Sequence, residues 1–166
     1  MLSFNRMLFF ASLAVGLLNA ASTTTTFTVN ATVINTCHIS ATDLNFGNYD
    51  PLSVTPTDGT STITVTCVLN SAYEVALDKG SGSGSDFTTG RKMTGDTNAT
   101  ELLTYNLYTE ASHTTVWGDG TGSSTVSGTG SGPLSSINHT VYGRIPANEN
   151  VSAQTYQDTI TATINY

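Results

Sequence analysis

The chain has 166 residues, of which only 10% are charged, and its 12 acidic residues against 5 basic ones give a net charge of −7. So few cations cannot form a basic surface, which argues against binding to nucleic acid or to anionic membranes. The length suits one domain with a single core, and the wealth of Thr, Ser, Gly, Asn and Val is typical of an exported all-β protein.

The first residues predict a targeting segment. Arg6 precedes an apolar run at 7–18, and small residues suitable for cleavage follow at 19–22. We therefore assign residues 1–20 to a signal peptide, with cleavage after residue 21 or 22 left open. The apolar run is short for a membrane span, so membrane insertion of the mature chain is not expected.

Residues 23–37, "TTTTFTVNATVINTC", alternate between apolar and polar side chains in front of the first cysteine. An apolar face made of every second residue is what an amphipathic β-strand requires. The members of this face are Phe27, Val29, Ala31 and Val33. Two interpretations stay open: the strand begins a complete sandwich, or it pairs with another copy of the chain.

Further alternating segments follow in chain order, separated by turn residues: 44–46, 61–69, 73–77, 102–109, 140–145 and 156–166. Two Gly- and Ser-rich stretches, 80–85 and 118–132, are predicted to be loops or irregular hairpins. Roughly six to eight strands at these spacings predict a two-sheet sandwich of immunoglobulin-like type in one domain.

The chain has two cysteines, Cys37 and Cys67, and Cys67 falls on the apolar face of the 61–69 strand. In an oxidising compartment these two residues most simply form one structural disulfide. Two cysteines without a close pair in the sequence do not predict a metal site.

The last predicted strand reaches the final residue of the sequence. Its apolar face consists of Ile160, Ala162, Ile164 and Tyr166. An exposed alternating strand is an aggregation hazard unless it is used for pairing, so we expect this strand to have a partner.

Catalysis has little support in the sequence. The three histidines occupy unrelated positions: His38, His113 and His139. No nucleophile or metal-binding motif accompanies them, so no catalytic residue, metal or cofactor is predicted. Three aromatic residues are candidates for a sugar-binding surface: Tyr108, Trp117 and Tyr142. Core packing is the favoured interpretation, because large aromatic side chains dominate burial.

The following sequence segments occur in this order along the chain: "NTCHISATDLNFGNYDP", "STITVTC", "LLTYNLYT" with "VWGDG", "VYGRIPA" and "YQDTITATINY". Together they resemble the spore coat protein U domain family, which includes the major subunits of archaic chaperone–usher pili. The likeness covers about residues 27–166, and it rests on the whole set rather than on any one phrase.

The resemblance implies an incomplete immunoglobulin-like sandwich that lacks its final strand. A periplasmic chaperone would fill the resulting groove, and an outer-membrane usher would exchange it for the N-terminal extension of the next subunit. Residues 21–33 would be this donor strand, with Phe27, Val29, Ala31 and Val33 inserted, and 34–166 would be the pilin domain. The expected acceptor edge, which the chaperone would also contact, is Ile160, Ala162, Ile164 and Tyr166.

The resemblance implies a structural, non-enzymatic subunit of a surface fibre. Its head-to-tail homopolymer would be exported through the periplasm to the cell surface, where it would serve biofilm formation or attachment. The alternatives are a secreted spore or cell coat protein and a carbohydrate-binding β-sandwich module.

Overall fold

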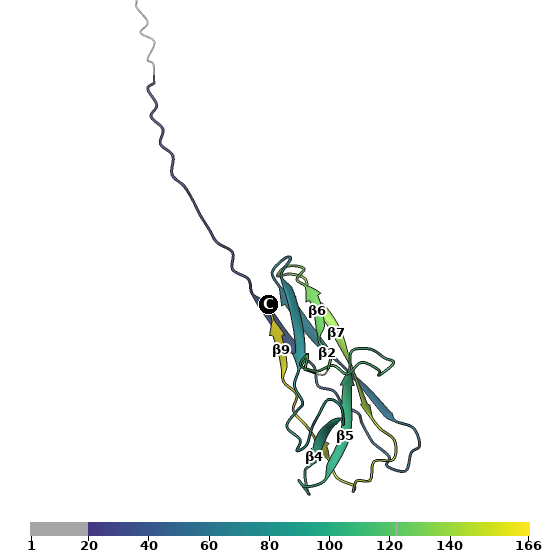
Figure 1. Ribbon diagram of the computed structural model, residues 1–166. Helices are drawn as coiled ribbons and strands as arrows, with labels where there is room; N and C mark the ends of the chain where they lie inside the picture. Colours follow the sequence, from purple (N-terminus) through teal and green to yellow (C-terminus); the bar gives the residue numbers. More distant parts are fainter. Residues whose placement is uncertain (1–19, 122) are drawn as a thin grey trace, which may run out of the picture. The chain divides into compact units, whose positions relative to one another are not determined.

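The computed structural model describes residues 20–121 and 123–166, and regular structure in these ranges consists of β-strands (Figure 1). The signal-peptide assignment falls on residues 1–19, outside the described residues, and on Ala20. Residues 20–36 are exposed and have no assigned strand. The strand predicted for 23–37 is therefore not formed in the single chain, and of these residues only Cys37 belongs to a strand. The physical reason is that a strand needs a partner edge for its main-chain groups.

The larger sheet has six strands in the order β1-β2-β7-β5-β4-β8, and each neighbouring pair is antiparallel. The strands are β1 (Cys37–Ala41), β2 (Thr57–Cys67), β7 (Ile137–Ile145), β5 (Leu102–Tyr108), β4 (Arg91–Gly95) and β8 (Tyr156–Gln157). The smaller sheet has the order β6-β3-β9. It consists of β6 (Val126–Thr129), β3 (Ala72–Leu77) and β9 (Ala162–Asn165). The prediction of an all-β sandwich is confirmed.

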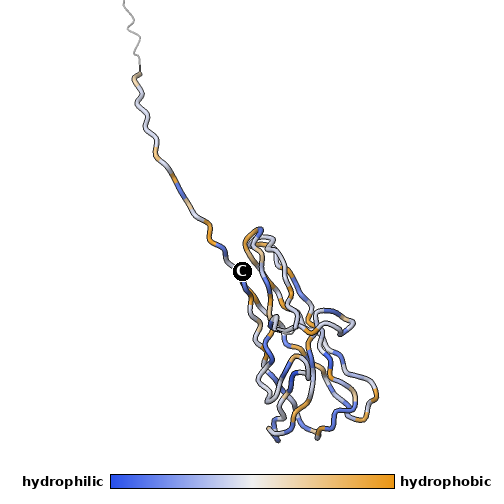
Figure 2. The backbone as a smooth tube through the Cα atoms, viewed as in Figure 1, coloured by the Kyte–Doolittle hydropathy of each residue, from blue (hydrophilic) through white to orange (hydrophobic). Residues whose placement is uncertain are grey.

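Alternate residues of the strands form the core between the two sheets. Figure 2 shows hydrophobic and hydrophilic residues following one another along the strands. Ile63, Val65 and Cys67 of β2 are buried, as are Val75 and Leu77 of β3. Trp117 is completely buried, and its indole Nε1 donates a hydrogen bond to the carbonyl of Val75 (2.9 Å). Trp117 is thus a core residue, as the sequence favoured.

The two cysteines form the predicted disulfide. Cys37 and Cys67 lie directly opposite each other in the β1–β2 ladder, with their Cα atoms 4.1 Å apart. Cys67 is buried, and Cys37 is half-buried at the edge of the larger sheet. The bridge therefore ties the edge strand β1 to its single ladder neighbour, β2.

The C-terminal segment differs from its prediction. Residues 156–166 form two strands rather than one, because β8 pairs with β4 in the larger sheet and β9 pairs with β3 in the smaller one. The sequence did not predict β4 or β6, nor β1 beyond Cys37, and these strands complete the sheets. Residues 126–129 belong to the stretch predicted to be a loop or an irregular hairpin, and their pairing with β3 is a tertiary effect.

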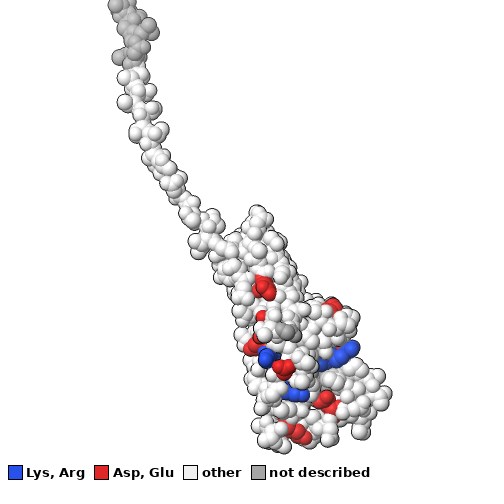
Figure 3. Space-filling model, viewed as in Figure 1, with Lys and Arg blue, Asp and Glu red and all other residues white. Residues whose placement is uncertain are grey.

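The basic residues of the described ranges are all engaged in contacts. Lys79 and Arg144 pair with Asp86 and Asp58, and Lys92 donates to the hydroxyl of Thr104. Figure 3 shows basic side chains interspersed with acidic ones on the visible face. The described residues therefore present no basic patch. Over the same residues, no helix is both long and apolar enough to cross a membrane.

Arg91 is completely buried, and it holds three parts of the domain together. Its guanidinium donates hydrogen bonds to the carbonyls of Asp78 (2.8 Å) and Trp117 (2.7 Å) and to the side-chain oxygen of Asn106 (2.8 Å). Burial lowers the pKa of Arg91. Because the donors have partners, this charge strengthens the core behind β4 and β5 rather than offering a surface site.

Candidate functional site: an apolar groove between two sheet edges

An open groove lies between the sheets on the side where β1 and β9 are edge strands. Its cavity volume is about 510 Å³. One wall comes from residues 41–46, which end β1 and follow it, and the other comes from residues 156–160 and Ala162. Its floor consists of core side chains: Ile63, Leu77, Met93, Tyr105, Leu107 and Val141. The groove thus reaches the core of the sandwich from one side, although its floor side chains are at most 9% exposed.

The wall at β9 has unpaired main-chain groups. The amide of Asp78 donates to the carbonyl of Thr161 (3.0 Å), and Leu77 lies opposite Ala162. In an antiparallel ladder, neighbouring residues turn their main-chain groups to opposite edges. The amides and carbonyls of Ala162 and Ile164 therefore face the open edge, while their half-buried side chains pack against the core.

The wall at β1 also has main-chain groups without a partner strand. The amide of Thr42 donates to the carbonyl of Thr62 (3.0 Å), and the amide of Val68 donates to that of Thr36 (3.1 Å). By the same alternation, Ile39 and Ala41 turn their main-chain groups away from β2. The groove is therefore flanked by two open edges. An extended segment in the groove could pair with either edge and direct alternate side chains into the floor.

Of the four predicted acceptor residues, two line the groove and two do not. Ile160 and Ala162 line the groove, and Ile164 packs against the core farther along β9. Tyr166 lies beyond the end of β9, is 56% exposed and does not line the groove. Their role as an acceptor edge stays a prediction.

The predicted donor residues are exposed in the single chain. Phe27 and Val33 are both 86% exposed and Val29 is 81% exposed, and Ala31 is exposed as well. Removing these apolar side chains from water would be favourable, and the single chain does not gain that free energy. Their insertion into another subunit likewise stays a prediction.

Two glycines make room for the wall that follows β1. Gly59 of β2 and Gly143 of β7 lie opposite each other on the inner face of the larger sheet. A Cβ atom at Gly143 would lie 2.8 Å from both Leu44 Cδ1 and Phe46 Cζ. Leu44 and Phe46 therefore pack directly against the main chain of these two glycines. The alternation in the sequence predicted a strand at 44–46, but the structure assigns no strand there. Glycines at inward positions of two strands were the available signal for this wall.

We expect Gly143→Ala to lower the free energy of unfolding by about 1–3 kcal/mol, because the added methyl group overpacks this wall. Denaturant titration measures the effect. The Gly143→Ala/Leu44→Ala double variant should lose less than the sum of the two single variants, since shortening Leu44 makes room for the methyl group. Thr140→Ala, on the outer face of β7, serves as the control. Strictly additive losses would show that Leu44 does not pack on Gly143.

Asp158 fixes the crossing of the C-terminal segment from one sheet to the other. Its carboxylate accepts hydrogen bonds from the amide (2.7 Å) and hydroxyl (2.8 Å) of Ser81 and from the hydroxyl of Tyr105 (2.7 Å). Burial, reinforced by the bond to Asp158, raises the pKa of Tyr105. The only ionisable side chain of the floor is thereby kept neutral, and the wall at 156–162 is anchored to it.

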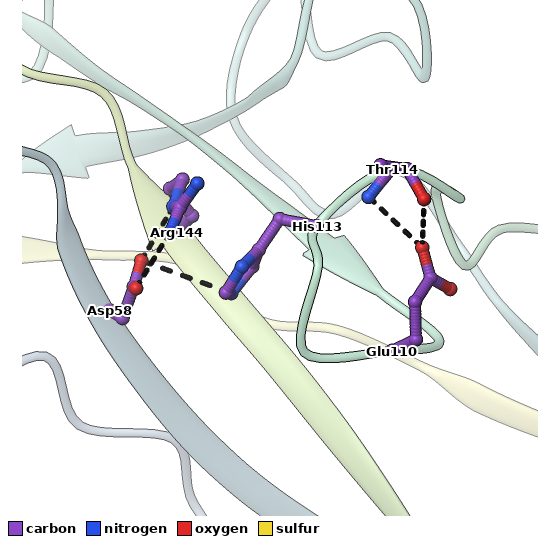
Figure 4. Close-up of polar contacts among 5 residues, drawn as sticks. All are labelled: Asp58, Glu110, His113, Thr114 and Arg144. Carbon is purple, nitrogen blue, oxygen red and sulfur yellow. Dashed lines mark hydrogen bonds and ion pairs between the residues drawn. The ribbon is translucent and has the colours of Figure 1, made fainter.

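A second group of polar residues lies near the start of β2 (Figure 4). Arg144 binds both carboxylate oxygens of Asp58, at 2.6 and 2.8 Å, and this hydrogen bonding lowers the pKa of Asp58. The ring of His113 lies 3.8 Å from the same carboxylate. Because Arg144 occupies Asp58, the group is a structural ion pair and not an acid–base site.

The loop that carries His113 is closed by Glu110. Its carboxylate accepts hydrogen bonds from the amide (2.9 Å) and hydroxyl (2.6 Å) of Thr114, and bonds from the hydroxyls of Thr109 and Thr114 and the amides of Thr115 and Thr114 lower its pKa to about 2. The ring of His113 packs edge-on against Tyr108, at 5.2 Å between centroids.

The three predicted sugar-binding aromatics do not form an open platform. Tyr108 and Tyr142 both pack against His113, whereas Trp117 is buried in the core. The histidines are likewise dispersed, because His38 is exposed on β1 and His139 bonds to the hydroxyl of Tyr73 (2.8 Å). No group of three or more metal-ligating side chains occurs among the described residues. The groove is therefore the candidate site.

Comparisons with known proteins agree with this geometry. A family model described as the Spore Coat Protein U domain matches residues 23–163. "Protein U" of Myxococcus xanthus is 32% identical over 161 residues, which cover 89% of this chain and 87% of that protein. The family and the structural relative described below are structural rather than enzymatic, in line with the expectation from the sequence.

A solved structure has the same fold. It is the pre-assembly complex of the chaperone CsuC with the tip adhesion subunit CsuE, from archaic chaperone–usher Csu pili of Acinetobacter baumannii. The likeness has a TM-score of 0.59 and 27% sequence identity, and it covers 81% of this chain. It covers 41% of the matched chain, so this chain spans less than half of that protein's length.

Proposed function

This chain belongs to the Spore Coat Protein U domain family, and from that membership and the open groove we propose that it is a structural subunit of a surface fibre. Each subunit lends residues 21–33 to the groove of the next one, so that the fibre grows by donor-strand exchange. The subunit domain is 34–166. The contact is head to tail and leaves one groove and one extension free, which gives an open polymer.

The observation that carries this proposal is the groove with two unpaired edges in a chain that also has an unused apolar strand face. The groove needs a segment with main-chain donors and acceptors and apolar side chains at every second position. Residues 27, 29, 31 and 33 provide Phe, Val, Ala and Val in that spacing. A one-residue shift would place Thr or Asn in the floor, which fixes the register.

The proposal includes two transient partners. A periplasmic chaperone lends a strand to the groove before assembly, in contact with Ile160, Ala162, Ile164 and Tyr166, and an outer-membrane usher catalyses the exchange. Support comes from the solved relative, which is a chaperone–subunit complex of a chaperone–usher pilus. Export through the periplasm to the cell surface, and a role in attachment or biofilm formation, complete the proposal.

The decisive experiment compares the mature chain with a variant that lacks residues 21–33, both expressed in the periplasm with the chaperone. Size-exclusion chromatography and electron microscopy should show linear polymers for the mature chain and none for the deletion variant. Stable monomers of both proteins would contradict the proposal and favour a carbohydrate-binding module. Amorphous or sheet-like assemblies would favour the coat-protein alternative that the family's description suggests.

A further inference from the structure

We infer that successive subunits of the proposed fibre also pack together through apolar residues at the two ends of the sandwich. This inference rests on the proposed function and goes beyond it, because it concerns a contact between domains and not the inserted strand. The partner surface is a second copy of this chain. We call the end where β1 begins the linker end, and the end where β2 begins the far end.

The linker end exposes three large apolar side chains. Leu134 is 101% exposed, Ile34 is 74% exposed and Leu69 is 67% exposed. Main-chain hydrogen bonds hold their turns together: the amide of Gly132 donates to Cys67 (3.1 Å), and the amide of Val68 donates to Thr36 (3.1 Å). Leu69 and Leu134 thus lie in neighbouring turns beside the chain that leads into β1.

The far end exposes a second apolar pair. Leu52 is 89% exposed and Val54 is 82% exposed, in the loop that precedes β2. This loop lies next to the end of β7, where Thr57 pairs with Ile145 and the hydroxyl of Tyr49 donates to the carbonyl of Pro146 (2.8 Å). Since β2 has 11 residues, the two ends lie roughly 33 Å apart.

The short linker brings the domains of neighbouring subunits into contact. Residues 34–36 alone separate the last predicted donor residue, Val33, from Cys37 at the start of β1. Four Cα–Cα steps span at most about 14 Å, so the donor's linker end must lie next to the acceptor's groove. Side chains exposed at that end are therefore buried by the acceptor.

An open fibre determines which end of the acceptor takes part. If the donor strand left the groove at the acceptor's linker end, identical surfaces would face each other, and two copies could close into a pair. A continuing fibre instead requires the donor to leave at the far end. The linker end of one subunit, with Leu69 and Leu134, then meets Leu52 and Val54 of the next.

The linker end brings no charge of its own to this contact. Residues 68–71 and 130–136, the turns of the linker end, contain no acidic or basic residue, although the chain has a net charge of −7. Figure 3 shows this end of the domain almost free of charged side chains. An uncharged apolar end allows negatively charged copies to stack.

A cysteine pair tests the contact in fibres of the full mature chain. The Leu52→Cys/Leu134→Cys double variant, assembled and then mildly oxidised, should give a ladder of covalent oligomers on a non-reducing gel. The native cysteines do not interfere, because they form their own disulfide. The Leu134→Cys single variant is the control and should stay monomeric on the gel. Covalent dimers of this control would show that like ends meet, and would overturn the inference.

Fibre stiffness provides a second measurement. Leu69→Ser/Leu134→Ser should leave the thermal unfolding of the domain unchanged, since both side chains are exposed, but should shorten the persistence length of fibres in electron micrographs at least twofold. Fibres of unchanged stiffness would overturn the inference and leave donor-strand exchange intact. Failure of the unsubstituted chain to form any fibre would overturn the proposed function, and this inference with it.

Discussion

Val29→Asp is expected to abolish fibre assembly while the 34–166 domain stays folded and able to bind its chaperone. In the proposed fibre this side chain enters an apolar groove, where an unpaired carboxylate costs several kcal/mol. Since each 1.4 kcal/mol changes an equilibrium constant tenfold, we expect strand insertion to weaken at least a hundredfold. Ala31→Asp should have the same effect, because Ala31 belongs to the same face.

The matched control for this prediction is Asn30→Asp. It adds the same charge one residue away, on the face of the donor strand that points out of the groove. Polymer length in electron micrographs and the rate of assembly from purified chaperone–subunit complexes measure the difference. Equal assembly of the Val29→Asp and Asn30→Asp variants would show that residues 21–33 do not insert with the proposed register.

Removing the disulfide is the second change for which we expect a large effect. The Cys37→Ala/Cys67→Ala variant should lose about 3–4 kcal/mol of stability, the chain-entropy value for a loop closed across a separation of 30 residues. Small domains are stable by only about 5–15 kcal/mol, so most of the periplasmic yield should be lost. Alanine is preferred to serine here because Cys67 is buried, and a hydroxyl group would add a cost of its own.

The location of the bridge adds a functional consequence. The strand β1 has one ladder neighbour, β2, and its last residue, Ala41, begins one wall of the groove. Without the bridge, β1 should separate from β2 more readily, and the groove should lose that wall. Urea unfolding and limited proteolysis, each with and without reductant, measure this. A variant as stable and as protease-resistant as the oxidised parent would show that the bridge contributes nothing.

The groove also explains why an isolated subunit should be a poor final product. The floor residues belong to the core and are buried, but the groove reaches them from one side, and the edges of β1 and β9 have unpaired main-chain groups. Uncovered edges of this kind lead to uncontrolled pairing between copies. A chaperone strand would cover the groove and its edges before assembly, and the strand of a neighbouring subunit would cover them in the fibre.

The sequence by itself determined the class of the fold and much of its order. Strict alternation in 61–69 and 73–77 predicted strands whose inward residues Val65 and Val75 are buried, whereas Leu69 lies beyond the end of β2 and is 67% exposed. The same pattern placed Cys67 on an inward face, which made the disulfide predictable, and it marked 27–33 as apolar on one side. These are local properties, because a strand with one buried face needs a period of two wherever it lies.

Only the tertiary structure decided the shape of the site. The single strand predicted for 156–166 is divided between two sheets, because Asp158 is bound by Ser81 and Tyr105 and the chain then turns to pair with β3. The wall at Leu44 and Phe46 depends on glycines that lie far from them in the sequence. Such contacts join residues more than ten positions apart, and no local pattern records them. The unoccupied place between β1 and β9 is a property of the whole sandwich, so it became visible only when both sheets were assembled.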